Sequence, residues 1–391
     1  MRRNALLFVL ISLLSGFGST AMTLAAGIWV FDLTGSVSLA ALTAICIYVP
    51  TLAAPWLGAL VDRLPRRPLL IVADLALGAL LLTLLAVRSA EASWLIFVVL
   101  LARGVSYVVI DAGETAVLPS ALTPKILADV NGWRSSAQEG MKLVAPLAGA
   151  SLYAWRGPTA VVLLCAALPL LTAVCYALMR LTPSEPARRD SPGFRPGLRA
   201  LFGVPAVRGP VLVAAAAIGA SGLKDAAVLA HLVHDLGLPA TRLGYLGTAQ
   251  GAGSIVAGVV VGRVLARLTP LTVTAVGAAG FAVGCLVQAL PWWPTMIAGS
   301  LLIGVGLPWA LIAAVTAVQT RTPDHLLGRV AATSNTVMFG PVALGIPLGA
   351  ALIHLGAVLP LVIAAAVSVS AALVVPRTAV GSPVRMINSG R

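Results

Sequence analysis

Residues 58–68 read GALVDRLPRRP, and here a long apolar run ends in one acid and three arginines. The pattern predicts the end of one apolar helix, a short turn and the start of the next helix. Residues 258–267 read GVVVGRVLAR and repeat the glycine, the three-residue spacer and the first arginine 200 positions later. This echo predicts that the chain contains two copies of one unit.

The composition places the chain in a lipid bilayer. Of its 391 residues, 59% are hydrophobic and 10% are charged, which is too apolar for a water-soluble domain. The four cysteines lack a metal-type spacing and indicate no disulfide framework. Stretches of the roughly 17 to 25 residues that cross a hydrocarbon core recur throughout. We predict twelve spans, at 6–30, 38–60, 69–88, 93–116, 136–155, 158–180, 209–233, 242–264, 270–290, 294–318, 330–354 and 357–375.

The lysines and arginines set the orientation. If both termini are cytoplasmic, twenty of these 26 residues fall in inner segments, and only Arg88, Arg156 and Arg242 fall in outer ones. Inner loops of membrane proteins carry this excess. An anionic inner leaflet also accounts for the net charge of +13, so nucleic acid is not an expected partner. We predict a multi-pass protein of a bacterial inner membrane, with both termini cytoplasmic. The first helix resembles a signal peptide, but another spanning run follows it directly.

The longest connector divides the predicted spans into six and six. Residues 181–208 are rich in proline and arginine and form a predicted cytoplasmic linker between residues 1–180 and 209–391, the second part ending in a short cytoplasmic tail. Residues 123–130 match 322–330, and residues 146–150 match 347–351, both at nearly the same offset. Duplication of a six-helix half explains these matches. The predicted fold is therefore an all-α integral membrane protein of two pseudo-symmetric six-helix bundles.

Residues 58–67 resemble the G-x-x-x-D-R-x-x-R-R signature of the major facilitator superfamily, with Pro65 in place of a usual glycine. Residues 31–36 and 319–330 resemble its bacterial drug, macrolide and siderophore exporter branch. Residues 145–149 resemble the G-P-x-x-G antiporter signature, with alanine replacing the first glycine, and Arg103 stands where such exporters commonly carry an arginine. The resemblance covers essentially the whole chain and implies transport by alternating access.

Charged residues around the first signature suggest a conformational latch. Asp62 ends span two, where the start of span eleven would approach it, and Asp111 and Glu114 end span four on the same side. Breaking such contacts would open the cytoplasmic side, and because Gly262 replaces the acid in the second copy, the latch would be asymmetric. The alternative is that the arginines only fix orientation. The latch residues are Gly58, Asp62, Arg63, Arg66, Arg67, Asp111 and Glu114.

Charges inside the membrane are costly and mark candidates for function. Arg103 lies near the middle of span four, and Lys224 and Asp225 interrupt span seven. Neighbouring helical residues point about 100° apart, so Lys224 and Asp225 are not expected to face one partner. Asp225 is the candidate protonatable carboxylate. The alternative is that both residues pair with charges on other helices, such as Glu139 or Lys142, and are merely tolerated.

The resemblance implies a central cavity lined by spans one, four, seven and ten. Its predicted lining is Phe17, Trp29, Arg103, Tyr107, Lys224, Asp225 and Trp309, with Gln250 and Asn335 nearby. A mainly apolar wall suits an amphipathic organic molecule, and Arg103 would favour an anionic one. Asp74 is assigned to the inner charge cluster, and His231 and His234 to the outer interface. The predicted hinge residues are Pro146, Gly149, Pro341 and Pro347.

These features predict a monomeric transporter that exports hydrophobic or amphipathic small molecules in exchange for protons. The alternatives are an importer or facilitator of a metabolite, and a non-transporting sensor or assembly protein that keeps the fold. The sequence shows no nucleophile with a base, no metal-ligand cluster and no phosphate loop. We therefore expect neither an enzyme nor a cofactor.

Overall fold

The computed structural model describes residues 2–61, 64–122, 124–179, 194–322 and 324–380, and in these ranges every regular element is a helix. The first part of the chain forms α1 (Arg2–Thr34), α2 (Val37–Leu42), α3 (Ile45–Leu52), α4 (Ala54–Val61), α5 (Arg66–Leu82), the short turns η1 (Thr83–Ala86) and η2 (Ala90–Ser93), α6 (Trp94–Ala121) and α7 (Pro124–Leu178). The second part forms α8 (Phe194–Gly203), α9 (Pro205–Ala230), η3 (His231–Asp235), η4 (Ala240–Arg242), α10 (Leu243–Leu265), α11 (Pro270–Gln288), α12 (Trp293–Arg321), α13 (Asp324–Phe339), α14 (Val342–Leu352), η5 (Ile353–Leu355) and α15 (Leu359–Val380).

Long apolar helices dominate the described residues. Nine of them are long and apolar enough to cross a membrane, and two shorter apolar helices cover Val37–Leu52 and Leu359–Val374. One of the nine, Asp129–Leu178, has 50 residues and contains a non-helical residue, Gly157 (φ 73°). The predicted fifth and sixth spans lie on either side of this break. The structure thus supports a multi-pass membrane protein, while the count of twelve spans stays a prediction.

The predicted second span, 38–60, is not one continuous helix. It forms α2, α3 and α4, because threonine hydroxyls and a proline interrupt the backbone ladder. Thr43 donates to the carbonyl of Ala40 (2.7 Å), Thr51 donates to that of Tyr48 (2.6 Å), and Pro50 has no N–H to donate. The predicted eleventh span also divides, between α13 and α14, at Gly340 and Pro341.

Among the described residues, four turns contain a glycine with positive φ, and these glycines fall into two pairs. Gly35 and Gly237 are about 200 positions apart, as are Gly157 and Gly356, which is the interval of the sequence repeats. We call the end of the molecule with these turns the distal end, and the end where α1 begins and α12 ends the proximal end. The pairing supports the proposed duplication.

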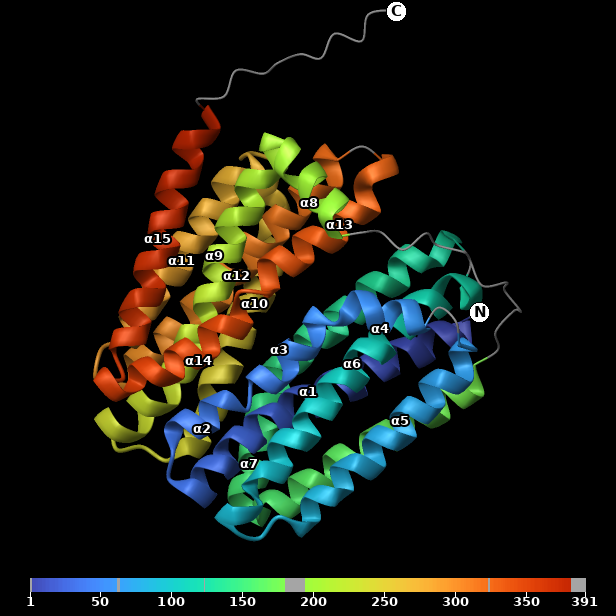
Figure 1. Cartoon of the computed structure of the whole chain (residues 1–391), viewed down its shortest axis with the longest axis vertical. Coiled ribbons are helices and arrows are strands. Elements are labelled where there is room, and N and C mark those ends of the chain that lie inside the picture. The colour runs from blue at the N-terminus through green and yellow to red at the C-terminus, as the bar shows by residue number, and fades with distance from the viewer. Residues whose placement is uncertain (1, 62–63, 123, 180–193, 323, 381–391) are drawn as a thin grey trace, which may run out of the picture.

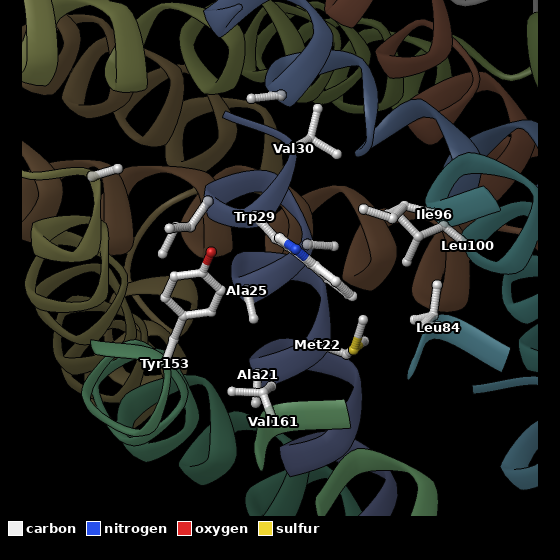
Figure 2. Close-up of a cluster of buried hydrophobic side chains, with 14 of the residues drawn as sticks. Ala21, Met22, Ala25, Trp29, Val30, Leu84, Ile96, Leu100, Tyr153 and Val161 are labelled. Atoms are coloured by element: carbon white, nitrogen blue, oxygen red, sulfur yellow. The ribbon is translucent and has the colours of Figure 1, made fainter. Parts of the chain in front are cut away.

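Helices α1 to α7 lie together, and so do α8 to α15 (Figure 1). The two groups, here called the first and second halves, meet where α7 contacts α10 and where α2 contacts α9 and α14. Toward α4, α8 and α13 the halves lie further apart in Figure 1. A buried apolar cluster near the distal end contains Met22, Trp29, Leu84 and Leu100 of the first half and Leu229 of the second. Figure 2 shows Trp29 inside this cluster.

Candidate functional site

Four polar side chains form a stripe along α6. Arg103, Tyr107, Asp111 and Glu114 follow one another at intervals of four, four and three residues, so they share one face of the helix. The stripe runs from mid-span toward the proximal end. Arg103 and Tyr107 were predicted to line the cavity, and Asp111 and Glu114 were predicted to form the latch. The structure places all four on the same face of α6.

Arg103 connects two helices of the first half. It is 8% exposed, its Nη2 donates to the carbonyl oxygen of Ser19 (2.9 Å), and its Nη1 donates to Oγ1 of Thr23 (3.3 Å). Both acceptors belong to α1. The prediction that Arg103 lines the cavity is therefore wrong, because backbone and hydroxyl oxygens of α1 draw the guanidinium into the first half.

Glu114 belongs to a buried polar network. It forms an ion pair with Arg134 of α7 and accepts a hydrogen bond from the hydroxyl of Tyr176. Arg134 also donates to Oγ of Ser12 (3.2 Å) and lies over the ring of Phe8 (5.8 Å). The network joins α1, α6 and α7, so Glu114 is committed to Arg134 rather than to the arginines of the predicted latch.

The rest of the predicted latch is only partly described. Asp62 and Arg63 lie outside the described residues, so their role stays a proposal. Arg67 does not face an acid. Its Nε donates to the carbonyl of Tyr176 (3.1 Å), and its Nη2 donates to that of Ala177, at the end of α7. A basic side chain at a helix C-terminus satisfies carbonyls that lack intrahelical partners.

Asp74 on α5 is buried against α7, with 3% of its surface exposed. It accepts a hydrogen bond from the hydroxyl of Thr172 (2.5 Å). Asp74 is therefore buried rather than interfacial. It still lies within electrostatic range of Glu114, another acid of the predicted inner charge cluster. The position of Asp74 in α5 places it on the side that packs against α7, together with Leu70 and Gly78.

Lys224 and Asp225 form an ion pair with each other. Nζ of Lys224 lies 2.6 Å from Oδ1 of Asp225 and 3.3 Å from Oε1 of Gln250. Glu139 and Lys142 likewise pair with each other (2.6 Å). The alternative in which Lys224 and Asp225 pair with Glu139 or Lys142 is therefore not observed. A flexible lysine side chain bridges the angle between neighbouring helical positions.

Asp225 is an exposed charge near mid-span. The side chain of Asp225 is 42% exposed, against 6% for Lys224, although both lie within the apolar segment Ala206–Asp235. Tyr48 of α3 lies within electrostatic range of both Asp225 and Tyr107. Tyr107 is 53% exposed. Asp225 of the second half and two tyrosines of the first half therefore form the candidate site. Tyr48 was missed because the resemblance puts span two outside the cavity.

Three other predicted lining residues pack inside helix clusters. Trp29 is buried, and Phe17 packs against the same cluster. The indole N–H of Trp309 donates to the carbonyl of Ala257 (3.2 Å), and its ring packs with Val261 and Val273. Trp29 is therefore buried rather than a cavity wall, because a large aromatic ring gains from burial between helices. Phe17 and Trp309 are only partly buried, so their place in the cavity wall stays a prediction.

His231 is buried and paired rather than interfacial. Its Nδ1 lies 2.6 Å from Oδ2 of Asp235, and its Nε2 lies 3.4 Å from the carbonyl oxygen of Leu290. These contacts form in η3, a π-helical turn that brings residues four apart together at the end of α9. His234 in the same turn is exposed.

The predicted hinge residues lie at close helix contacts. A Cβ added at Gly149 would lie 3.0 Å from Cβ of Ala21, and one added at Gly219 would lie 2.7 Å from Pro341. Pro146 and Pro347 lie inside α7 and α14. These positions show tight packing, and their role as hinges stays a proposal.

The site offers proton-accepting and hydrogen-bonding groups. In the described ranges, no three His, Cys, Asp or Glu side chains cluster as they would around a metal ion. All four cysteines are free and buried.

The sequence matches the family described as "Major Facilitator Superfamily" over residues 8–224 and again over residues 225–386. The chain therefore belongs to the Major Facilitator Superfamily, a family of membrane transporters. The two matches meet at Lys224 and Asp225. A search of curated protein sequences finds no match.

Solved transporter structures share the fold. A bacterial homologue of the iron transporter ferroportin in an inward-facing state is 16% identical, with 95% of this chain and 99% of that chain covered and a TM-score of 0.67. The POT family transporter PepTSo is 12% identical, with 97% and 98% covered and a TM-score of 0.76. The nucleoside transporter NupG is 13% identical, with 97% and 99% covered and a TM-score of 0.73. These structures belong to differently described transporters and are all less than 25% identical to this chain, so the likeness shows the fold alone.

Proposed function

We propose that this protein exports amphipathic small molecules by alternating access, in exchange for protons. The observation that carries the proposal is Asp225, a half-exposed carboxylate at mid-span that lies near Tyr48 of the other half. An exposed charge inside a bilayer needs a watery or polar surrounding, and charges of this kind mark substrate and ion pathways.

The proposed arrangement is a monomer with twelve membrane crossings in a bacterial inner membrane. Residues 1–180 and 209–391 would form two six-helix bundles, with residues 181–208 between them and both termini in the cytoplasm. Exposed tryptophans lie toward both ends of the described helices, with Trp94, Trp155 and Trp292 toward the distal end and Trp56 and Trp133 toward the proximal end. Tryptophan collects at both membrane interfaces, so this distribution supports membrane crossings between the two ends.

The chemistry of the site favours an amphipathic substrate. Tyr48 and Tyr107 offer aromatic surface and hydroxyls, and Asp225 offers an exposed acceptor for the polar group of a substrate. The guanidinium of Arg103 is engaged with α1, which removes the reason to expect an anionic molecule. Few polar anchors on a mainly apolar wall suit such a molecule better than a sugar.

The conformation supports access from the proximal side. At the distal end, α7 contacts α10 and α2 contacts α14, which closes that end. If the proximal end is cytoplasmic, Asp225 is open to the cytoplasm in this state. Export requires a second state in which the distal end opens and the proximal end closes.

The test is a flux measurement in membrane vesicles of opposite orientation. Everted vesicles with an imposed pH gradient should accumulate fluorescent amphipathic dyes, and collapse of the gradient should stop the uptake. Asp225→Asn should abolish it, whereas Asp129→Asn, at an exposed carboxylate near the proximal end, should not. Uptake only in right-side-out vesicles would favour an importer. Absence of flux with folded protein would favour a sensor or assembly protein.

A further inference from the structure

The π-helical turn η3 holds a histidine and a carboxylate together at the distal end. Nδ1 of His231 lies 2.6 Å from Oδ2 of Asp235. The imidazole is 1% exposed, whereas the side chain of Asp235 is 39% exposed. Turns of this type are rare inside helices and occur frequently at functional sites. Here the turn connects a buried ring to the distal surface through a carboxylate.

The second ring nitrogen also faces an oxygen. Nε2 of His231 lies 3.4 Å from the carbonyl oxygen of Leu290, in the connection between α11 and α12. A carboxylate and a carbonyl are both acceptors, but a neutral imidazole has one N–H donor and one bare nitrogen. A neutral ring beside an ionised Asp235 therefore directs a nitrogen lone pair at an oxygen.

One additional proton removes this mismatch. An imidazolium ring donates from both nitrogens, so His231 would donate to Asp235 and to Leu290 at the same time. Imidazole is a stronger base than a carboxylate, so we assign the proton to the ring. The two acceptors thus fit the proton-loaded form of the pair. When the proton leaves, the oxygen of Leu290 keeps the N–H of Trp292 as its donor (2.7 Å).

The pair lies apart from other charges. In the part of the chain that the structure describes, Asp235 is the one charged side chain paired with the ring. The elements packed around η3 carry further titratable side chains, and each of these faces solvent or has a different contact. They are His234, Arg242, Tyr245, Cys285 and His354. The carboxylate of Asp235 therefore sets the charge around His231.

A buried amide beside the same connection has an unused acceptor. Gln288 is 1% exposed and lies two residues before Leu290. Its Nε2 donates to Oγ of Ser300 (2.9 Å), but its Oε1 has no partner among the described residues. Buried polar atoms are nearly always paired, so this oxygen calls for an additional donor. It is a second observation that the interior near Leu290 is built to receive a proton-bearing group.

Helix α9 connects this pair to the candidate site. His231 follows Lys224 by seven residues, which is almost two turns, so the two side chains share a face about 10 Å apart along the axis. Lys224 pairs with Asp225, whose carboxylate is exposed in the state that is open proximally. Asp235 is exposed at the closed distal end. One helix therefore carries exposed carboxylates toward opposite sides of the molecule.

We propose that His231 and Asp235 bind one proton from the distal side and are the outer entry point for the proton of the exchange. Water at the distal surface gives the proton, the imidazole takes it on Nε2, and the carboxylate stabilises the charged ring. The proposal rests on the proton exchange argued above. It adds a proton-binding site that is separate from Asp225.

Nitrogen NMR of the ring tests whether the site binds a proton. Replacing His234, His325 and His354 with glutamine leaves His231 as the one histidine of the sequence. With labelled histidine in proteoliposomes, both ring nitrogens should carry protons at about pH 5, and one should have lost its proton at about pH 8. Asp235→Asn should lower the charged fraction between these limits, because an amide has no charge to stabilise the imidazolium. A ring that stays neutral at the lower pH, or charged at the higher one, would overturn the proposal.

Flux measurements test whether this proton enters the exchange. In everted vesicles the distal end faces the lumen if the proximal end is cytoplasmic. With an acidic lumen, His231→Gln should lower dye uptake to the level seen without a gradient, and Asp235→Asn should act in the same direction. His234→Gln, at the exposed histidine of the same turn, should keep the parent rate.

The two readouts separate this proposal from the proposed function. Gradient-driven uptake that persists in His231→Gln would refute the entry-point role. The NMR measurement uses no substrate and retains His231, so it does not depend on whether His231→Gln folds. A ring that binds and releases the proton in a parent protein without proton-driven flux would contradict only the proposed function.

Discussion

The hydroxyl of Ser38 on α2 donates a hydrogen bond to the carbonyl oxygen of Ala350 on α14, at 3.1 Å across the two halves. The same oxygen of Ser38 lies 3.2 Å from Nε2 of His354. A second such contact joins Oγ1 of Thr248 to the carbonyl of Leu143 (2.8 Å). Single hydrogen bonds contribute only about 0.5–1.5 kcal/mol, so contacts of this kind close the distal end without locking it.

Removing the Ser38 hydroxyl should shift the equilibrium toward a distally open state. The expected change for Ser38→Ala is at least about two- to twelvefold, the equivalent of the hydrogen bond to Ala350, because the contact with His354 is lost as well. Spin labels at Glu91 and Leu355, which are exposed near the distal end in different halves, should report it as a larger long-distance population. Ser89→Ala, at an exposed serine of the same end, is the control. An equal effect of both variants would show that the contact does not hold the halves together.

The Glu114 and Arg134 pair should be costly to break. Both side chains are largely buried, so Glu114→Ala leaves a buried guanidinium without its main partner and should cost about 3–5 kcal/mol of stability. Tyr176→Phe removes one hydrogen bond to the same charged carboxylate and should cost about 1.5–3 kcal/mol. Thermal unfolding of the purified variants measures both effects.

Replacing both members of the pair separates charge from packing. Glu114→Leu combined with Arg134→Met should recover most of the stability lost in Glu114→Ala, because apolar residues of similar volume leave no buried charge unpaired. A double variant as unstable as Glu114→Ala would mean that the network stabilises the fold through shape and not through charge pairing.

The broad architecture follows from the sequence because bilayer thickness fixes the length of an apolar helix. Predicted limits such as 270–290 and 294–318 therefore agree well with α11 and α12. The second span was predicted poorly because its breaks depend on how Thr43 and Thr51 hydrogen-bond to nearby carbonyls. Hydropathy does not record such contacts.

The site was harder to predict than the fold. Asp225 stands out in the sequence because it is a charge in an apolar run, and the structure leaves it exposed. Arg103 stands out for the same reason, yet it is buried against α1. The rotation of each helix about its axis distinguishes these outcomes, and neighbouring helices set that rotation. Tyr48 carries no such signal at all.

Arg103 and Tyr107 should respond differently to truncation. Arg103→Ala removes buried hydrogen bonds between α6 and α1, so it should lower the thermal stability of the protein with or without substrate. Tyr107→Ala removes an exposed side chain that lies within electrostatic range of Tyr48, and it should reduce transport with little change in melting temperature. Thermal unfolding and dye flux on the same preparations separate the two effects. Stability that is unchanged in Arg103→Ala would contradict the structural role of the guanidinium.

The break in α7 should depend on the backbone of Gly157 alone. Its φ of 73° and ψ of −174° fall in a region that is essentially restricted to glycine. No atom would lie within 4 Å of an added Cβ, so a substitution there causes strain without a clash. Gly157→Ala and Gly157→Asn should both lower stability by about 1–3 kcal/mol. Gly157→Asn should be as destabilising as Gly157→Ala, because this ψ lies outside the left-handed helical region that asparagine tolerates.

Gly140→Ala provides the matched control in the same helix. Gly140 also has open space around an added Cβ, but it lies within the helical part of α7, where alanine is favoured over glycine by about 1 kcal/mol. The melting temperature should therefore fall in Gly157→Ala and rise in Gly140→Ala. If Gly157→Ala were as stable as the parent protein, the chain at this turn would have another accessible conformation. The break in the 50-residue segment Asp129–Leu178 would then depend on its surroundings and not on Gly157.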